Sequence, residues 1–305
     1  MGEMKTVALA GAAGLLGSHV FKALLDSNRY AITVLTRALS SHTFPSSVRV
    51  VEVDYQSSAS LRSALEGQDI LISVLGKVAL SSQTLLISAA VAAGVSRIIP
   101  SEFGSDLRNH MVRQFPTYQP KIAVEEKLEQ HRTDSGVSYT LIFTNVLLDW
   151  GLVDGFVMDP RSRVVKLYDG GKNLFSTTTL ATVGRAVVAV VDNCHLTSNR
   201  AVYIQDIATT QAELVEMAQE ATANDGGKDW TIEAIDTAEL EAESWSGFKQ
   251  GLFTPKVFFG FAARAAFASG YGGHFQILDN ELLGIRQMQR EDLREFVHRV
   301  VRRVD

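Results

Sequence analysis

The chain has little of several features that mark large classes of protein. Its 305 residues contain one cysteine, Cys194, so an intramolecular disulfide is impossible and a reducing compartment is expected. The net charge of −5 gives no basic surface for nucleic acid or for an anionic membrane. No apolar run reaches the roughly 20 residues that span a bilayer. The first residues do not form the basic and then apolar pattern of a signal peptide, so we expect a cytoplasmic protein that binds neither nucleic acid nor membrane.

Metal and hydrolase motifs are also absent. The seven histidines are scattered, and Cys194 and His195 stand together without further metal ligands nearby in the sequence. No Gly-x-Ser-x-Gly turn occurs. The composition, 46% hydrophobic and 21% charged, is that of an ordinary soluble protein with a sizeable core. The sequence therefore predicts neither a metal centre nor a serine hydrolase of that type.

The first half of the chain alternates short apolar segments with helical patterns. This alternation predicts a Rossmann-type α/β fold, in which a doubly wound parallel sheet is covered by helices on both faces. We expect a nucleotide-binding domain over residues 1–150 and a smaller, mainly substrate-binding α+β domain over residues 151–305. A helix at about 180–191 and a strand at about 201–205 are expected to pack back on the first domain. The predicted strands are 6–10, 31–36, 48–53, 69–75, 97–100 and 139–144, and the predicted helices are 15–27, 58–65, 81–93 and 122–135.

The most informative segment joins the first predicted strand to the first predicted helix. There Gly11 would allow a tight turn, Gly14 would let the backbone approach a pyrophosphate, and Gly17 would let the helix pack closely. The N–H groups at the helix start, with their partial positive charge, would hold the phosphates. Small residues also cluster in ordinary strand-to-helix turns, so the motif alone is weak evidence. The expected cofactor contacts in this turn are Gly11, Ala13, Gly14, Leu15, Leu16 and Gly17.

The other predicted strands end in residues suited to the same ligand. The second ends at Arg37, where an acidic residue would favour NAD and an arginine suits the ribose phosphate of NADP. The third ends at Asp54, placed to border an adenine, and the fourth ends at Gly76. Because the carboxyl ends of parallel strands meet at one edge of a sheet, we expect one NADP(H) site there. The residues closely behind the arginine are Ser40, Ser41 and His42, and the expected contacts from the fifth and sixth strands are Ser101, Phe103, Thr144 and Asn145.

Taken together, these motifs resemble a known family, the isoflavone reductase-like or NmrA-like group of atypical short-chain dehydrogenases. The resemblance rests on the glycine turn, Arg37, Asp54, the Pro-Ser-Glu-Phe-Gly motif within 93–106, and the segment 121–127. It is close through residue 150 and looser afterwards. The resemblance implies that Lys121 is the catalytic group, that Arg37 contacts the NADP phosphate, and that the glycine turn holds the pyrophosphate.

Two positions depart from the pattern of the plant reductases in this group. They often have a lysine where this chain has Ser46, which predicts a weaker grip on NADP. They often have an arginine where this chain has Glu125, one helical turn after Lys121. A carboxylate there could pair with the lysine across the turn, which puts the protonation states of the site in doubt.

Lys121 also has a plainer interpretation. It follows Pro120 at a predicted helix start, and an exposed lysine in a first turn is usually a solvated charge. The positive helix terminus would lower the pKa of such a lysine and help it exchange protons near neutrality. Tyr118 stands one residue out of register for the Tyr-x-x-x-Lys pair of ordinary short-chain dehydrogenases. The family motif upstream therefore carries the catalytic assignment.

The second half of the chain is less regular. Residues 163–167 and 174–177 predict a hairpin around the Asp-Gly-Gly of 169–171, and a solvated surface helix is predicted over 280–301. The phenylalanine-rich segment 248–270 suits a core, or the wall of an apolar substrate pocket. Tyr271 and His274 follow it and could supply polar contacts to a substrate, although an ordinary loop histidine is equally compatible.

Together with these observations, the resemblance implies an NADPH-dependent reductase of secondary metabolism. It would transfer hydride to an electrophilic carbon of a small aromatic molecule, with Lys121 as general acid or base. The expected substrate contacts are Phe103, Asn145, Tyr271 and His274. Two other classes stay open: a regulator that binds NAD(P) and reports redox state without turnover, and an isomerase or cyclase that retains the nucleotide. The sequence does not specify the substrate or the oligomeric state.

Overall fold

The computed structural model describes residues 5–38 and 42–303. The chain forms two compact units that alternate along the sequence. Unit 1 comprises residues 1–103, 120–142 and 181–202, and unit 2 comprises residues 104–119, 143–180 and 203–305. Compactness alone does not show what each unit binds, so the division at residue 150 by function stays a prediction.

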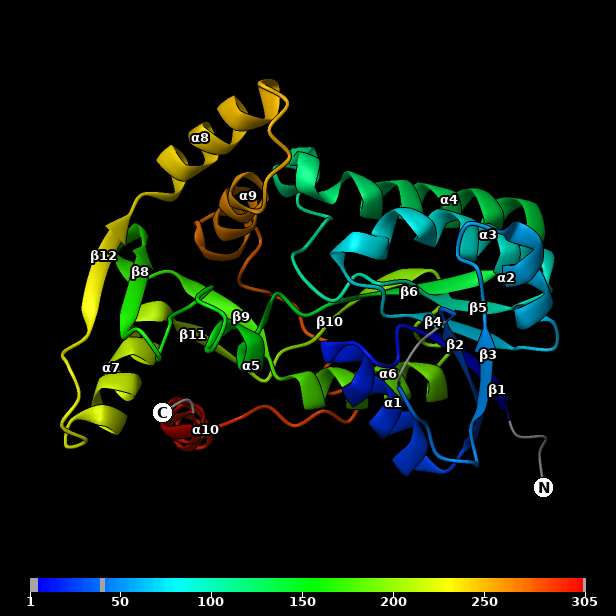
Figure 1. The fold of residues 1–305 in the computed structure, drawn as a ribbon, viewed down its shortest axis with the longest axis horizontal. Helices are drawn as coiled ribbons and strands as arrows, with labels where there is room; N and C mark the ends of the chain where they lie inside the picture. The colour runs from blue at the N-terminus through cyan, green and yellow to red at the C-terminus, as the bar shows by residue number, and fades with distance from the viewer. Residues whose placement is uncertain (1–4, 39–41, 304–305) are drawn as a thin grey trace. The chain divides into compact units, whose positions relative to one another are not determined.

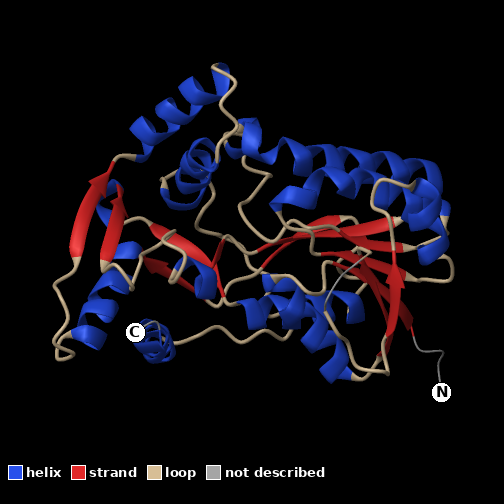
Figure 2. Ribbon diagram, viewed as in Figure 1, coloured by secondary structure: helices blue, strands red, loops and turns tan. Residues whose placement is uncertain are grey.

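Unit 1 is built around a seven-stranded sheet of order β10-β6-β5-β4-β1-β2-β3 (Figure 1). The pairs from β6 to β3 across this sheet are parallel. Helices lie on both of its faces (Figure 2). This is the doubly wound Rossmann-type fold that the sequence predicts. The strands are Lys5–Ala10 (β1), Tyr30–Thr36 (β2), Arg49–Glu52 (β3), Ile70–Ser73 (β4), Arg97–Ile99 (β5), Ser138–Phe143 (β6) and Arg200–Tyr203 (β10).

The strands at the centre of this sheet are largely apolar because both faces of the sheet are covered. In β1, Val7 lies opposite Ile32 of β2 and Ile70 of β4, and all three are buried. Strands covered on both faces cannot alternate polar and apolar residues, because either face would bury the polar ones. The chain order reverses between β1 and β4, which is where open α/β sheets bind ligands. The helices of unit 1 are Leu15–Ser27 (α1), Ser58–Leu65 (α2), Gln83–Ala92 (α3), Gln119–Ser135 (α4) and Leu180–Asp192 (α6), with a 3-10 turn at Lys77–Ser82 (η1).

One helix boundary matters for the site. The sequence predicted that α4 begins at residue 122, but it begins at Gln119. Pro120 therefore lies inside the first turn, where proline lacks only an N–H that has no helical partner. Lys121 is consequently the third residue of the helix.

Unit 2 contains two small sheets, of order β11-β9-β7 and β12-β8. The strands are Val146–Leu147 (β7), Val164–Tyr168 (β8), Leu174–Thr178 (β9), Ile207–Thr210 (β11) and Thr231–Ile235 (β12). The helices are Leu148–Gly151 (α5), Gln211–Thr222 (α7), Thr237–Lys249 (α8), Pro255–Phe267 (α9) and Arg290–Arg303 (α10). Short 3-10 turns lie at Val112–Gln114 (η2), Pro116–Tyr118 (η3) and Asp169–Gly171 (η4).

The predicted hairpin around residues 169–171 is wrong. β8 pairs in parallel with β12, and β9 pairs with β11 and β7 instead. Asp169, Gly170 and Gly171 all have positive φ, at 48°, 74° and 67°. Three successive left-handed residues redirect the chain away from β8, so the two strands enter different sheets.

The predicted last helix also starts too early. Residues 280–289 are not helical, and α10 begins only at Arg290. The Asn280 side-chain amide donates to the carbonyl oxygens of Gln205 and Ile285, and Gly284 has a φ of 62°. These turn contacts occupy the segment that a regular helix would need.

The core of unit 2 is aromatic, as expected for much of the phenylalanine-rich segment. Phe267 packs on Tyr168, Phe175 and Phe156 with ring centroids about 5 Å apart (4.9, 5.0 and 5.2 Å). Phe253 is an exception, since 65% of it is exposed. Among the described residues, no helix has both the length and the apolar character needed to cross a bilayer.

Candidate active site

The turn after β1 needs glycine at two positions. Gly11 has a φ of 90°, and a Cβ there would lie 2.5 Å from the carbonyl oxygen of Val74. A Cβ on Gly17 would lie 1.9 Å from the carbonyl oxygen of Gly11. Both distances are far below contact, so no other residue fits without a shift of backbone. The glycines thus hold the turn close to β4 and bring the start of α1 onto the turn.

Gly14 has a different role. It is the N-cap of α1: its N–H donates to the carbonyl of Gly11 at 3.0 Å, and its carbonyl accepts from Ser18 at 2.9 Å. A Cβ at Gly14 would lie 3.3 Å from the carbonyl oxygen of Gly11, a tight but not impossible contact. The first turn of α1 has no acidic residue, so its N–H groups can attract an anion. Ala13, Gly14 and Leu15 are exposed beside it.

A cleft of about 960 Å³ opens at this edge of the sheet in unit 1. Ligand sites of proteins usually measure roughly 300–1,000 Å³, so the cleft can hold a large ligand. It brings together the turn after β1 and the ends of β2, β3 and β4, including the predicted residues Arg37, Asp54 and Gly76. His42 lines it as well, whereas Ser40 and Ser41 lie outside the described residues.

The same cleft contains residues that the sequence did not single out. Glu52, the last residue of β3, lines the cleft. It pairs with Thr36 of β2, the residue before Arg37, so Glu52 and Arg37 lie close together at the ends of neighbouring strands. Phe44 lines the cleft too and packs edge-on against Phe21 of α1, with ring centroids 5.3 Å apart. Neither residue belongs to a motif. Their only signal is a position shortly after β2 or at the end of β3.

Asp54 and Tyr55 border the cleft in a turn that side-chain hydrogen bonds stabilise. Asp54 Oδ1 accepts the N–H of Gln56 at 2.9 Å, and the hydroxyl of Tyr55 donates to the carbonyl of Leu35 at 3.3 Å. Burial raises the pKa of Tyr55 to about 12, although the charge of Arg37 acts in the opposite direction. The phenol therefore stays neutral in the cleft at physiological pH.

Lys121 points into unit 1 rather than into solvent. Only 15% of its side chain is exposed. Its ammonium donates to the main-chain carbonyl of Glu102, and Nζ lies 3.9 Å from Oε2 of the same residue. The Glu102 side chain is completely buried. Two of the sequence segments that carry the family resemblance, the Pro-Ser-Glu-Phe-Gly motif and the segment 121–127, thus meet at this lysine, through residues 19 apart in the chain.

The neighbours of Glu102 anchor its loop. Ser101 donates its N–H to Oε1 of Gln83 at 2.7 Å and its hydroxyl to the carbonyl of Leu75 at 2.9 Å. Phe103 is buried, has a φ of 32°, and donates its N–H to the carbonyl of Ile142 at 2.9 Å. Positive φ is rare for a phenylalanine, and such strain clusters at functional sites. Ser101 and Phe103 therefore shape the loop from within.

The remaining predicted site residues belong to unit 2. Asn145 has a φ of 47° and donates its side-chain amide to the carbonyls of Ser176 and Gly273, at 3.1 and 2.7 Å. Thr144 is buried, and its carbonyl accepts the hydroxyl of Thr178 at 2.9 Å. Asn145 thus ties β7 to β9 and to the loop that carries His274.

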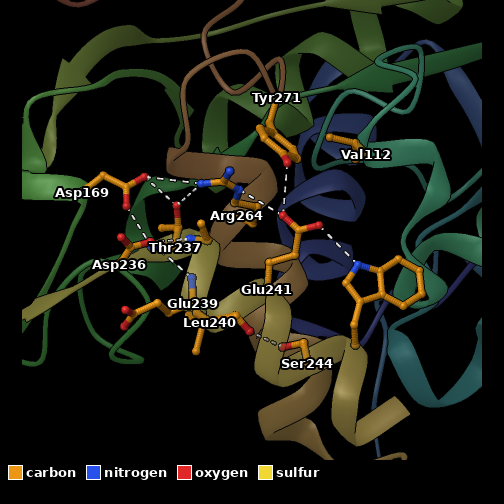
Figure 3. A network of polar contacts seen from close by, with 12 residues as sticks. Val112, Asp169, Asp236, Thr237, Glu239, Leu240, Glu241, Ser244, Arg264 and Tyr271 are labelled. Atoms are coloured by element: carbon orange, nitrogen blue, oxygen red, sulfur yellow. Dashed lines mark hydrogen bonds and ion pairs between the residues drawn. The ribbon is translucent and has the colours of Figure 1, made fainter. Parts of the chain in front are cut away.

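Tyr271 belongs to a polar network of unit 2 (Figure 3). Its hydroxyl donates to Glu241 at 3.1 Å, its ring stacks on Phe115, and the Arg264 guanidinium lies over the ring, 4.5 Å from its centroid. Arg264 also bonds Glu241 at 3.1 Å and the hydroxyl of Thr237 at 2.7 Å. Tyr271 is therefore held by α8 and α9. His274 is half-buried, and Gln276 contacts its ring at 3.2 Å.

Within the described part of the chain, no group of three or more histidine, cysteine or acidic side chains could hold a metal ion.

Most of the chain matches the model of a known protein family. The model of the NmrA-like family matches residues 3–225. The chain belongs to the NmrA-like family.

Relatives and solved structures agree with this assignment. The oxidoreductase aprR of Aspergillus flavus is 34% identical over 236 residues, which cover 76% of this chain and 78% of that protein. The phenylcoumaran benzylic ether reductase PT1 of Pinus taeda is 28% identical over 69% of this chain and 72% of that protein. The structure of the leucoanthocyanidin reductase–NADPH complex from Vitis vinifera has the same fold, with a TM-score of 0.75 and 20% identity over 96% of this chain and 99% of that one.

Proposed function

We propose that this protein is an NADPH-dependent reductase that transfers hydride to an electrophilic carbon of a small aromatic metabolite. Its membership of the NmrA-like family, and the similar proteins named oxidoreductase and benzylic ether reductase, support an NADP-dependent oxidoreductase. The acceptor would be a conjugated alkene, an imine, a carbonyl or a quinone-methide-like carbon.

The cleft fits the proposed cofactor. The glycine turn lines the cleft, and the N–H groups at the start of α1 would hold the pyrophosphate of the cofactor. Arg37 lines the same cleft and would pair with the ribose phosphate that distinguishes NADPH from NADH. NADPH, when bound, supplies the hydride. The chain's own task is then to place the acceptor and to handle the charge that develops on it.

The observation that carries the proposed mechanism is the inward position of Lys121. A lysine in the first turn of a helix normally extends into water, because the positive helix end and the cost of dehydration both favour exposure. Here the ammonium lies against Glu102, with only 15% of the side chain exposed. A sheltered ammonium can donate a proton to a developing anion, or neutralise it, more effectively than one in water.

The proposed substrate contacts differ in the hydrogen bonds that their side chains already make within the protein. Asn145 and Tyr271 already bond carbonyls and Glu241 within unit 2, so a substrate contact by either would require that bond to be shared or exchanged. His274 is half-buried, and its recorded contacts are with Gln276 two residues away. We therefore propose His274 as the main polar contact of the substrate and Phe103 as an apolar one.

The test is the fate of the hydride. Purified protein is titrated with NADPH and NADH by calorimetry, and then incubated with NADPH deuterated at the transferring position and a panel of aromatic acceptors. We expect tighter binding of NADPH and one deuterium in the product, detected by mass spectrometry. Nucleotide binding without consumption across the panel would favour a redox-sensing regulator. Product formation without net NADPH consumption would favour an isomerase or cyclase.

A further inference from the structure

The loop after β5, residues 100–103, is held more firmly than a connection of its length requires. The N–H of Glu102 donates to the carbonyl of Pro100 at 2.9 Å, and the N–H of Phe103 donates to Ile142 at 2.9 Å. Ser101 is bonded through both its N–H and its hydroxyl, to Gln83 and Leu75. These contacts stabilise a backbone in which Phe103 has positive φ. The loop is therefore fixed in a conformation that a free chain would avoid.

We propose that this loop is a built cradle for the Lys121 ammonium, and that Glu102 and Gln83 are positioning residues for that lysine. The inference deepens the proposed reductase function and rests on it for its catalytic meaning. Glu102 acts directly, through its carbonyl and its carboxylate. Gln83 acts one step further away, by holding Ser101 and hence the direction in which Glu102 faces.

Charge explains why Glu102 is needed. Its side chain is fully buried, and a buried carboxylate is costly unless an opposite charge lies close. Lys121 supplies that charge at 3.9 Å, and Glu102 in turn stabilises a buried ammonium near a positive helix end. The pair keeps the lysine both charged and turned inward. A neutral side chain of the same shape at position 102 would keep the carbonyl contact but lose the charge.

Gln83 is buried and holds the backbone of the loop at Ser101. It is the first residue of α3, its side chain is fully buried, and its Oε1 accepts the N–H of Ser101 at 2.7 Å. Its amide nitrogen has no hydrogen-bond partner within residues 5–38 and 42–303. Burying an amide with an unsatisfied N–H costs free energy, and the bond to Ser101 offsets part of that cost. That bond joins the start of α3 to the lysine cradle.

The experiment measures the reactivity of the Lys121 amine without any substrate. Wild type, Glu102→Gln and Gln83→Met are acetylated with an N-hydroxysuccinimide ester, and the modified fraction at Lys121 is followed by peptide mass spectrometry. The reagent reacts with the uncharged, accessible amine. We expect labelling about tenfold faster in Glu102→Gln, since a one-unit change in protonation equilibrium corresponds to a factor of ten, and a smaller increase in Gln83→Met. Glu126→Gln, an exposed carboxylate on the same helix, is the control and should label as wild type does.

Kinetics then separate positioning from simple structural support. With an acceptor that wild type reduces, Glu102→Gln should lower kcat about tenfold or more while the Kd for NADPH stays within twofold. A merely structural residue would lower the melting temperature and leave kcat per folded molecule unchanged. Glu102→Asp, which keeps the charge on a shorter side chain, should recover part of the lost rate and serves as the second variant if Glu102→Gln fails to fold.

The possible failures are distinguishable. Equal labelling of Lys121 in wild type, Glu102→Gln and Glu102→Asp would overturn the cradle. Faster labelling together with an absence of turnover in every protein, wild type included, would support the cradle and contradict the reductase function. Faster labelling with unchanged kcat would show that the lysine's position does not limit the reaction, and the positioning role would be wrong.

Discussion

Two regions of unit 1 prepare for ligands by different physical means. The glycine turn between β1 and α1 uses backbone alone: its geometry depends on missing Cβ atoms, and the turn lines an open cleft. The lysine cradle uses charged side chains, Glu102 and Lys121, which are removed from water and held by a strained loop. The turn tolerates no added atoms at Gly11 or Gly17, whereas the ion pair tolerates changes of shape but not the loss of one partner. The two should therefore fail in different ways.

The largest effect is expected at the glycine turn. In Gly17→Ala the new methyl group would lie 1.9 Å from the carbonyl oxygen of Gly11, so the helix and the turn must separate. Overpacking against rigid backbone should lower the free energy of unfolding by about 3 kcal/mol or more and abolish binding of both NADPH and NADH. Chemical denaturation and calorimetry measure the two effects. Gly76→Ala, where a Cβ meets nothing within 4 Å, is the stability control; equal losses in both variants would contradict the packing argument.

The lysine cradle should fail through its charge. Lys121→Met should lower turnover about a hundredfold, the usual scale for a proton-transfer group, while NADPH affinity changes only a few fold. It should also lower the free energy of unfolding by about 3 kcal/mol, since the buried carboxylate of Glu102 loses the ammonium that lies 3.9 Å from it. The double variant Lys121→Met/Glu102→Gln should regain most of that stability and none of the turnover.

The control for this pair is Lys127→Met on the same helix, where the lysine contacts Gln130 at the surface. Its stability should change by less than about 0.5 kcal/mol. Additive losses in the double variant would show that Lys121 and Glu102 do not act as a pair. Full activity in Lys121→Met, on an acceptor that wild type reduces, would leave the lysine as a structural residue.

A smaller effect is expected at Arg37, whose side chain lines the cleft. One charge-assisted contact is worth roughly 1.5–3 kcal/mol, so Arg37→Ala should weaken NADPH about tenfold to a hundredfold and leave NADH nearly unchanged. Arg49→Ala, an exposed arginine at the start of β3, should change neither affinity. Equal losses for both cofactors in Arg37→Ala would place the arginine away from the ribose phosphate.

The sequence predicted most accurately the features that are determined by nearby residues, such as helix starts and strand ends. Helices α1 and α2 begin and end where predicted. Their starts are set by local caps: Gly14 is the N-cap of the first, and the Ser57 hydroxyl accepts the N–H of Ser60 in the second. The ends of β2, β3 and β4 meet at one cleft because parallel strands put their carboxyl ends at one edge. The contact between Lys121 and Glu102 had no such signal. The sequence suggested Glu125 as a partner by helical spacing, and that pairing stays a prediction; the ion pair with Glu102 joins the lysine to another element of the chain.

The failures in unit 2 have the same origin. The turn at 169–171 looks like a hairpin locally, but the partner of β8 is β12, more than 60 residues later. Likewise, the charge pattern before α10 suits a helix, yet Asn280 bonds backbone near β10 and β11 instead. Pairing between distant segments is decided by packing, which a local pattern does not encode.

The smallest effect should come from Tyr55, which lines the cleft but offers it a neutral phenol. Burial raises its pKa to about 12 from an ordinary value near 10, so the folded state holds this proton more tightly than the unfolded chain does. The stabilisation that this group contributes is complete below pH 10. It falls as pH rises from about 10 to 12, where the unfolded state has lost its proton and the folded state has not.

Tyr55→Phe should therefore make the loss of stability across that alkaline range less steep, while NADPH affinity at pH 7 stays within about twofold of wild type. Denaturant titrations at several pH values measure the slope. A large loss of NADPH affinity in Tyr55→Phe would mean that the hydroxyl bonds the cofactor rather than Leu35, and the cleft would then bind through side chains as well as backbone.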